Sequence, residues 1–157
     1  GLDPSAPSAY QNTKINTFLL SAAKFVADIG LTRFLPYLVD SSSAIKDGNL
    51  TEEEKELYRV IFYRRTATTS MINEAKTIKA NAKKLEEVDT TNVPMLFFIS
   101  NGDGTGYSKE EWRSFGVGYL ANKQNGKYQF LDCSHYVHNI AYQQIYEESI
   151  KFINQLK

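Results

Sequence analysis

Two side chains in this sequence are placed to carry acid–base chemistry together, Asp103 and His135. Asp103 lies in a glycine-rich loop, and His135 follows a β-rich segment that ends at Cys133. A carboxylate beside an imidazole fixes its tautomer and stabilises the imidazolium that forms when the ring accepts a proton. Such a pair is two thirds of a Ser–His–Asp triad. The G-x-S-x-G motif that would present the serine does not occur in the sequence.

The elements around these two residues are predicted to form a βαβα unit. Residues 95–99 (MLFFI) are apolar on both faces, as expected of a central parallel strand. Ser108 and Glu111 have capping-box spacing and predict a helix over 108–121. A strand over 128–133 and a helix over 140–156 follow. Because parallel strands end at the same edge of a sheet, the loops carrying Asp103 and His135 should lie side by side.

The preceding part of the chain is predicted to be helical. Residues 1–9 are expected to form a lead-in loop. An apolar stripe with steps of three and four runs from Ile15 to Ile29, and Gly30 suits the end of that helix. A short helical piece over 31–39 and a polar loop over 40–49 should follow. Thr51 and Glu54 predict a second helix to about residue 65, and a third is expected over 71–85.

The last part of the sequence resembles the α/β-hydrolase superfamily. The residues concerned are VPMLFFI (93–99) followed by Asp103, and a strand followed by SHYVH (134–138). The resemblance implies a partial α/β-hydrolase fold, with a helical cap over 10–90 and the C-terminal βαβα part of the core over 91–157. It assigns the acid role to Asp103 and the general-base role to His135. Gly1-Leu2-Asp3-Pro4 resembles the stretch after an earlier core strand, so Asp3 is a rival acid.

The resemblance implies the C-terminal portion of a serine hydrolase that acts on a small ester or amide. The serine and the oxyanion donors would lie in an absent N-terminal half, so the chain alone should be inactive. That half, or a second copy of the chain, is the expected partner because half a sheet exposes an unpaired edge. Phe18, Phe25 and Phe34 are candidates for an acyl pocket or for cap core. The alternative is a non-enzymatic helical interaction module.

Composition and motifs exclude several other functions. Eighteen Lys and Arg balance eighteen Asp and Glu, which argues against nucleic acid as a partner. No apolar run is long enough to span a membrane. Neither a metal nor a cofactor is predicted, because His135-x-x-His138 lacks a third ligand, and the calcium-like spacing from Asn101 has Trp112 where a glutamate belongs. The lone Cys133 favours a reducing compartment such as the cytoplasm.

Overall fold

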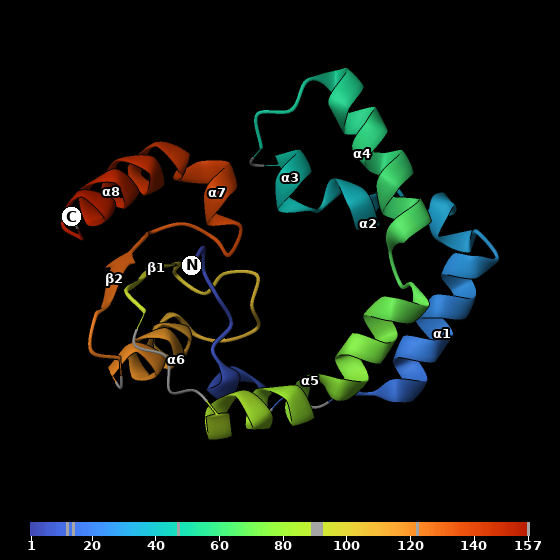
Figure 1. Cartoon of the computed structure of the whole chain (residues 1–157). Helices are drawn as coiled ribbons and strands as arrows, with labels where there is room; N and C mark the ends of the chain where they lie inside the picture. Colours follow the sequence, from blue (N-terminus) through green and yellow to red (C-terminus); the bar gives the residue numbers. More distant parts are fainter. Residues whose placement is uncertain (12, 14, 47, 89–92, 122, 157) are drawn as a thin grey trace. The chain divides into compact units, whose positions relative to one another are not determined.

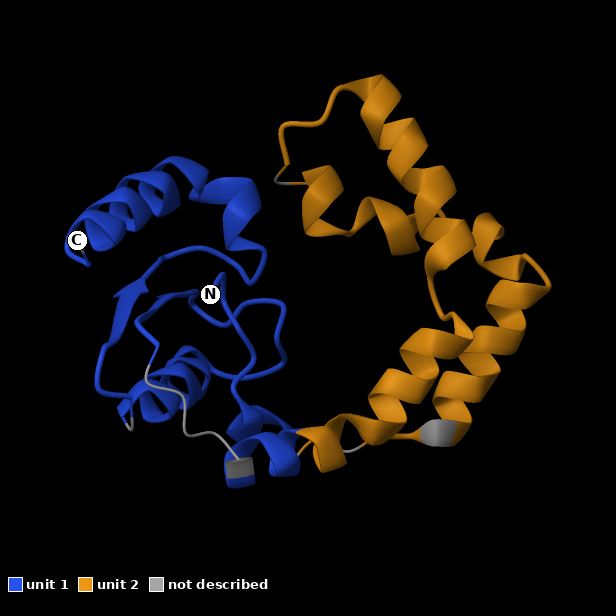
Figure 2. Ribbon diagram, in the orientation of Figure 1, with its two compact units in different colours: residues 1–12, 82–157 blue, residues 13–81 orange. Residues whose placement is uncertain are grey.

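The computed structural model describes residues 1–157 except 12, 14, 47, 89–92, 122 and 157. The chain divides into two compact units, shown in Figure 2. Unit 1 comprises residues 1–12 and 82–157, and unit 2 comprises residues 13–81. The helix α5 (Thr69–Val88) runs from unit 2 into unit 1. The division places the segment that opens the chain in the same unit as its C-terminal half.

Unit 1 is built around a short parallel sheet. β1 (Met95–Ile99) pairs with β2 (Gly126–Phe130), with Phe97 opposite Tyr128 in the register. The helix α6 (Lys109–Ala121) connects the two strands, and α7 (Val137–Ile140) and α8 (Tyr142–Asn154) follow β2. Figure 1 shows α6 and α8 on opposite sides of the strands. β1 is therefore covered on both faces.

Alternate residues of β1 enter two separate apolar clusters, as the two-residue period of a strand requires. Ile99 and Phe97 face Trp112 of α6 and Ala9 of the 3-10 helix η1 (Pro7–Tyr10). On the other face, Phe98 packs with Leu131 and Val137, both nearly inaccessible to solvent. At Gly116 of α6, an added Cβ would lie 2.7 Å from Ile99 Cδ1, so a larger residue there would displace the end of the Ile99 side chain.

The described residues of unit 2 form helices joined by turns and loops, with no strand among them. Its elements are α1 (Thr17–Asp28), the 3-10 helix η2 (Leu31–Phe34), α2 (Tyr37–Asp40), α3 (Ser43–Lys46), α4 (Glu52–Arg65) and the first part of α5. The capping box predicted at the start of α4 is confirmed, since Glu54 N donates to Thr51 Oγ1 and Thr51 N donates to the Glu54 carboxylate. The predicted loop over 40–49 is wrong in part, because α3 forms within it.

The predicted fold class, a partial α/β-hydrolase fold, is wrong. The described residues are mostly helical, and their sheet has two strands of five residues each. The local pattern of strand, helix and strand predicted these elements correctly, but a two-stranded sheet with its covering helices does not make a partial α/β-hydrolase fold. The second strand also begins at Gly126 and ends at Phe130, earlier than the predicted 128–133.

Candidate active site

The first three residues run alongside β1 and bring Asp3 to its carboxyl end. Phe98 N donates to Gly1 O at 2.9 Å, and Asp3 N donates to Phe98 O at 2.7 Å. These bonds form a parallel bridge between Leu2 and Phe98. Asp3 has a positive φ of 47°, which is uncommon for a residue with a side chain and often marks a functional constraint. Its side chain is turned inward, and the residue as a whole is 2% exposed.

Three nitrogen atoms, from Ser100, Trp112 and His135, lie within hydrogen-bond distance of the buried Asp3 carboxylate. Oδ1 accepts hydrogen bonds from Ser100 N at 2.7 Å and from Trp112 Nε1 at 2.9 Å. Oδ2 lies 2.7 Å from His135 Nδ1. Burial by itself would raise the pKa of Asp3, but the hydrogen bonds from His135, Ser100 and Trp112 outweigh it and lower that pKa below its ordinary value. Asp3 is therefore a carboxylate at neutral pH.

The Asp3 carboxylate and two aromatic rings hold the imidazole of His135 in place. The indole of Trp112 meets it edge to face, with ring centroids 5.6 Å apart, and the ring of Tyr136 lies 5.2 Å away. The side chain of His135 is 30% exposed. An ionised carboxylate can only accept hydrogen bonds, so Nδ1 of His135 carries the proton. In the neutral ring, Nε2 is then left with a free lone pair that can accept a proton.

Arg113 ties together the ends of the two strands next to this pair. Its Nε donates to Ser100 O at 3.1 Å and its Nη2 donates to Leu131 O at 3.0 Å. The guanidinium also lies 4.3 Å from the centroid of the Phe130 ring. Because Ser100 binds Asp3 and Leu131 leads toward His135, Arg113 helps to fix the spacing of the acid and the histidine.

Asp103 lies close to His135 through its backbone, whereas its carboxylate binds elsewhere. Its carbonyl oxygen accepts a hydrogen bond from His135 N at 2.9 Å. Its Oδ2 accepts from Asn101 Nδ2 at 2.9 Å, and its own N–H donates to Asn101 Oδ1 at 3.0 Å. The predicted pairing of the Asp103 carboxylate with His135 is thus replaced by the pairing with Asp3. The loop over 101–106 positions the backbone of His135 instead.

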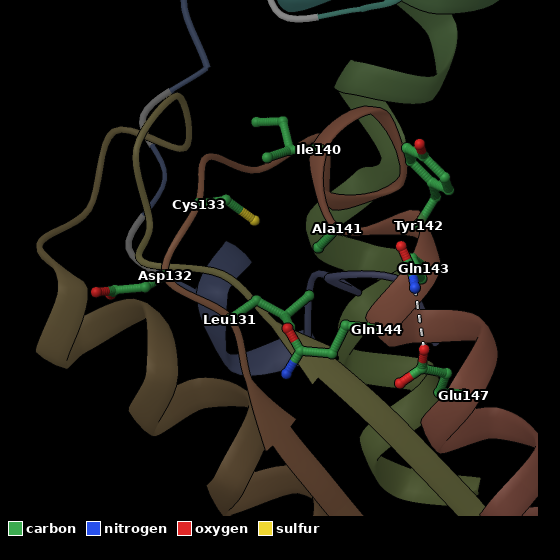
Figure 3. A pocket seen from close by; sticks show the side chains of 9 residues that line it. All are labelled: Leu131, Asp132, Cys133, Ile140, Ala141, Tyr142, Gln143, Gln144 and Glu147. Atoms are coloured by element: carbon green, nitrogen blue, oxygen red, sulfur yellow. Dashed lines mark hydrogen bonds between the residues drawn. The ribbon is translucent and has the colours of Figure 1, made fainter.

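Cys133 lines a pocket of about 560 Å³ between the end of β2 and the start of α8 (Figure 3). Residues 131–133 form one side of the pocket, and residues 140–144 with Glu147 form the other, where Gln143 Nε2 donates to Glu147. Burial raises the pKa of the Cys133 thiol, and the negative charges of Asp3 and Asp132 raise it further. A protonated thiol is a poor nucleophile, so Cys133 is suited to lining this pocket rather than to attack.

The phenylalanines considered for an acyl pocket are exposed on unit 2. Phe18, Phe25 and Phe34 are 82%, 64% and 80% exposed, and they line neither the pocket at Cys133 nor the pocket at α4 described below. Within the described parts of the chain, no three His, Cys, Asp or Glu side chains are grouped as a metal site would need. The described helices include none that is long and apolar enough to cross a membrane.

No family model matches the sequence, and no solved structure matches it. The absence of a structural match agrees with the correction of the fold class above. The chain is similar to the uncharacterized protein YbdG of Bacillus subtilis (strain 168), with 22% identity over 157 residues that cover 98% of this chain. These residues cover 48% of YbdG, so the chain spans about half the length of that relative.

Sequence reasoning left the acid open between Asp103 and Asp3, and it did not find the groups that hold the acid. The hydrogen bond from Trp112 to Asp3 crosses 109 positions of sequence. The contact between Asp3 and His135 crosses 132 positions. The one local signal for Asp3 is its place before Pro4, which indicates a turn and says nothing of a distant histidine.

Proposed function

We propose that Asp3 and His135 are the acid and the histidine of a Ser–His–Asp hydrolase that transfers the acyl group of a small ester or amide to water. The observation that carries this proposal is the 2.7 Å contact between Asp3 Oδ2 and His135 Nδ1, with Asp3 buried and also held by Ser100 and Trp112. A buried carboxylate that is fixed by other donors orients an imidazole without itself taking up a proton.

In this proposal, Nε2 of His135 takes the proton of a serine hydroxyl as the oxygen attacks the carbonyl carbon. The Asp3 carboxylate stabilises the imidazolium that results. His135 then gives the proton to the leaving alcohol or amine, and the same residue activates water for the release of the acid. The partial exposure of His135 supports this role, because a general base must reach both its substrate and solvent.

The serine and the oxyanion donors would come from a segment outside these 157 residues or from another chain. The sequence offers no G-x-S-x-G motif, and Ser100, the serine nearest to Asp3 in the hydrogen-bond network, has a buried side chain that accepts a bond from Gly102 N. The length of YbdG beyond the matched half leaves room for such a segment in a related protein. The position of the nucleophile can therefore be tested by sequencing the reading frame that contains these residues.

The decisive experiment uses the complete protein encoded by the reading frame that contains these residues. That frame should carry a G-x-S-x-G motif upstream of Gly1, and the protein should hydrolyse a 4-nitrophenyl ester. Asp3→Asn should lower kcat by about 10⁴-fold because it leaves the wrong tautomer of the histidine. His135→Ala should lower kcat at least as much. Asp103→Asn is the matched control and should retain nearly full activity.

Two results would contradict the proposal. Loss of turnover in Asp103→Asn with normal turnover in Asp3→Asn would reverse the assignment of the acid. Robust turnover by the 157-residue chain alone, abolished by His135→Ala, would show that the nucleophile lies within it. We expect the chain alone to give no turnover above that of its His135→Ala variant.

The second candidate function is a non-enzymatic interaction module. The observation that favours it is the high exposure of Phe18 and Phe34 in unit 2, since exposed aromatic side chains are common where proteins associate. The two functions are separated by one comparison of variants. A module predicts that Phe18→Ser impairs the biological role of the complete protein and that His135→Ala does not, whereas the hydrolase predicts loss with His135→Ala.

A further inference from the structure

Unit 2 contains a pocket of about 520 Å³ that three arginines line. Arg59 and Arg64 come from α4, and Arg33 comes from η2. On α4 the lining residues Glu56, Val60 and Arg64 are separated by four positions, as are Arg59 and Tyr63, so they share one side of the helix. The volume lies within the range of small-molecule sites in proteins.

The positive charge of this pocket is only partly neutralised. Arg59 Nε lies 2.9 Å from Asp40 Oδ1, and Arg59 Nη1 lies 2.7 Å from Glu56 Oε1. These two contacts fix the guanidinium of Arg59, and they pair its charge with the carboxylates of Asp40 and Glu56. Arg33 and Arg64 have no ion pair among the residues that the structure describes. Two guanidinium groups therefore remain to bind an external anion.

Apart from Glu56, whose carboxylate is paired with Arg59, the rest of the pocket wall is largely apolar. Pro36 and Val60 contribute aliphatic surface, and Tyr63 contributes an aromatic ring. The hydroxyl of Tyr63 donates to Leu35 O at 3.4 Å, which directs the ring along the segment that carries Pro36. A free inorganic ion would leave most of this volume and all of this apolar surface unused. A ligand with an apolar body attached to its anionic group would use both.

We infer that the pocket of Arg33, Arg59 and Arg64 binds a small organic anion, a phosphate monoester or a carboxylate joined to an apolar body. Guanidinium groups bind both oxyanions through paired hydrogen bonds, which explains why arginine rather than lysine lines the site. Arg33 and Arg64 make the contacts with the oxyanion, while Val60 and Tyr63 contact the apolar part. This site is separate from Asp3 and His135, and its test does not depend on hydrolysis.

The test measures binding to the full 157-residue chain by NMR titration at physiological ionic strength. The probes are phenyl phosphate, benzoate, inorganic phosphate and uncharged benzyl alcohol. Phenyl phosphate and benzoate should shift the amide resonances of Val60 and Tyr63 with saturation, and the dianionic phenyl phosphate should bind more tightly. Inorganic phosphate and benzyl alcohol should each bind at least about tenfold more weakly than phenyl phosphate, because each lacks one half of the recognised chemistry.

Variants show whether the arginines of the pocket are responsible. Arg33→Gln and Arg64→Gln should each weaken phenyl phosphate binding by about tenfold, the usual effect of losing a charge-assisted hydrogen bond. Arg65→Gln is the matched control, because it removes the same charge from the neighbouring position of α4 and Arg65 does not line the pocket. Arg33 and Arg64 are exposed, so circular dichroism should show an unchanged fold in both variants.

Several outcomes would overturn the inference. Equal weakening by Arg65→Gln would mean that the anions bind to general positive charge rather than to this pocket. Equal affinity for inorganic phosphate and phenyl phosphate would remove the role of the apolar wall. Absence of shifts at Val60 and Tyr63 with saturating phenyl phosphate and benzoate would show that the pocket does not bind either anion.

Discussion

Asp3 and His135, which are 132 positions apart in the sequence, meet at 2.7 Å between Oδ2 and Nδ1. The contact depends on residues 1–3 lying against β1 and on the 101–106 loop holding the backbone of His135 through Asp103 O. Both parts of this arrangement belong to unit 1.

Asp3→Asn should change the tautomer of His135. The amide that replaces the carboxylate can keep its oxygen toward Ser100 N and Trp112 Nε1, and its NH₂ group then faces His135 Nδ1. Two donors cannot pair, so the neutral ring should move its proton to Nε2. Nitrogen-15 NMR of the imidazole measures this directly. The Asp103 carboxylate binds Asn101 rather than His135, so Asp103→Asn should leave the nitrogen-15 spectrum of His135 unchanged. A change in that spectrum equal to the one caused by Asp3→Asn would contradict the pairing of Asp3 with His135.

The stability of unit 1 should fall in acid because of Asp3. The pKa of Asp3 is lower in the folded chain than its ordinary value of 3.8, so its contribution to stability is present above that value and is lost as the pH falls through the lower, folded pKa. Urea denaturation between neutral pH and about pH 2 measures the free energy of unfolding. In Asp3→Asn, the free energy of unfolding should fall less steeply as the pH is lowered over this range, which is the acid limb of the stability curve. An acid limb of the same slope in this variant would assign the effect to the other carboxylates.

Trp112→Phe should destabilise unit 1 by about 1–3 kcal/mol. The substitution keeps an aromatic ring in the core but removes the Nε1–H that binds the Asp3 carboxylate at 2.9 Å, and bonds to charged groups are worth about that much. The same loss should raise the pKa of Asp3, so the acid limb should begin at higher pH. Circular dichroism is the suitable probe. Tyr136→Phe, at an exposed ring, is the control and should change stability by less than about 0.5 kcal/mol.

Leu131→Ala should cost about 2–5 kcal/mol of unfolding free energy. Leu131 is 2% exposed and packs with Phe98 and Val137 at the end of β2, so truncation leaves a cavity beneath the segment that carries His135. Denaturant unfolding monitored by Trp112 fluorescence reports on the same unit, since Trp112 is the chain's one tryptophan. Val93→Ala, at a side chain that is 56% exposed, should cost less than about 1 kcal/mol. Equal costs would mean that Leu131 is not part of the core.

The sequence determined the features that depend on neighbours along the chain. The capping boxes at Thr51 and Ser108 fix the starts of α4 and α6, because a side chain and a backbone N–H three residues apart pair within one helical turn. The unbroken apolar run of β1 indicated a strand with both faces buried, and the structure has two apolar clusters there. It also placed His135 after β2.

Only the tertiary structure decided the extent of the sheet and which acid contacts His135. Asp103 is nearer in sequence, but Asn101 engages its side chain within the same loop. Asp3 makes the contact instead, because the bridge from Leu2 to Phe98 places it among Ser100, Trp112 and His135. No local pattern in the sequence relates Asp3 to these three residues. Residue types and their spacing encode helix starts and buried faces. Partners across more than a hundred positions are set by how the whole unit packs.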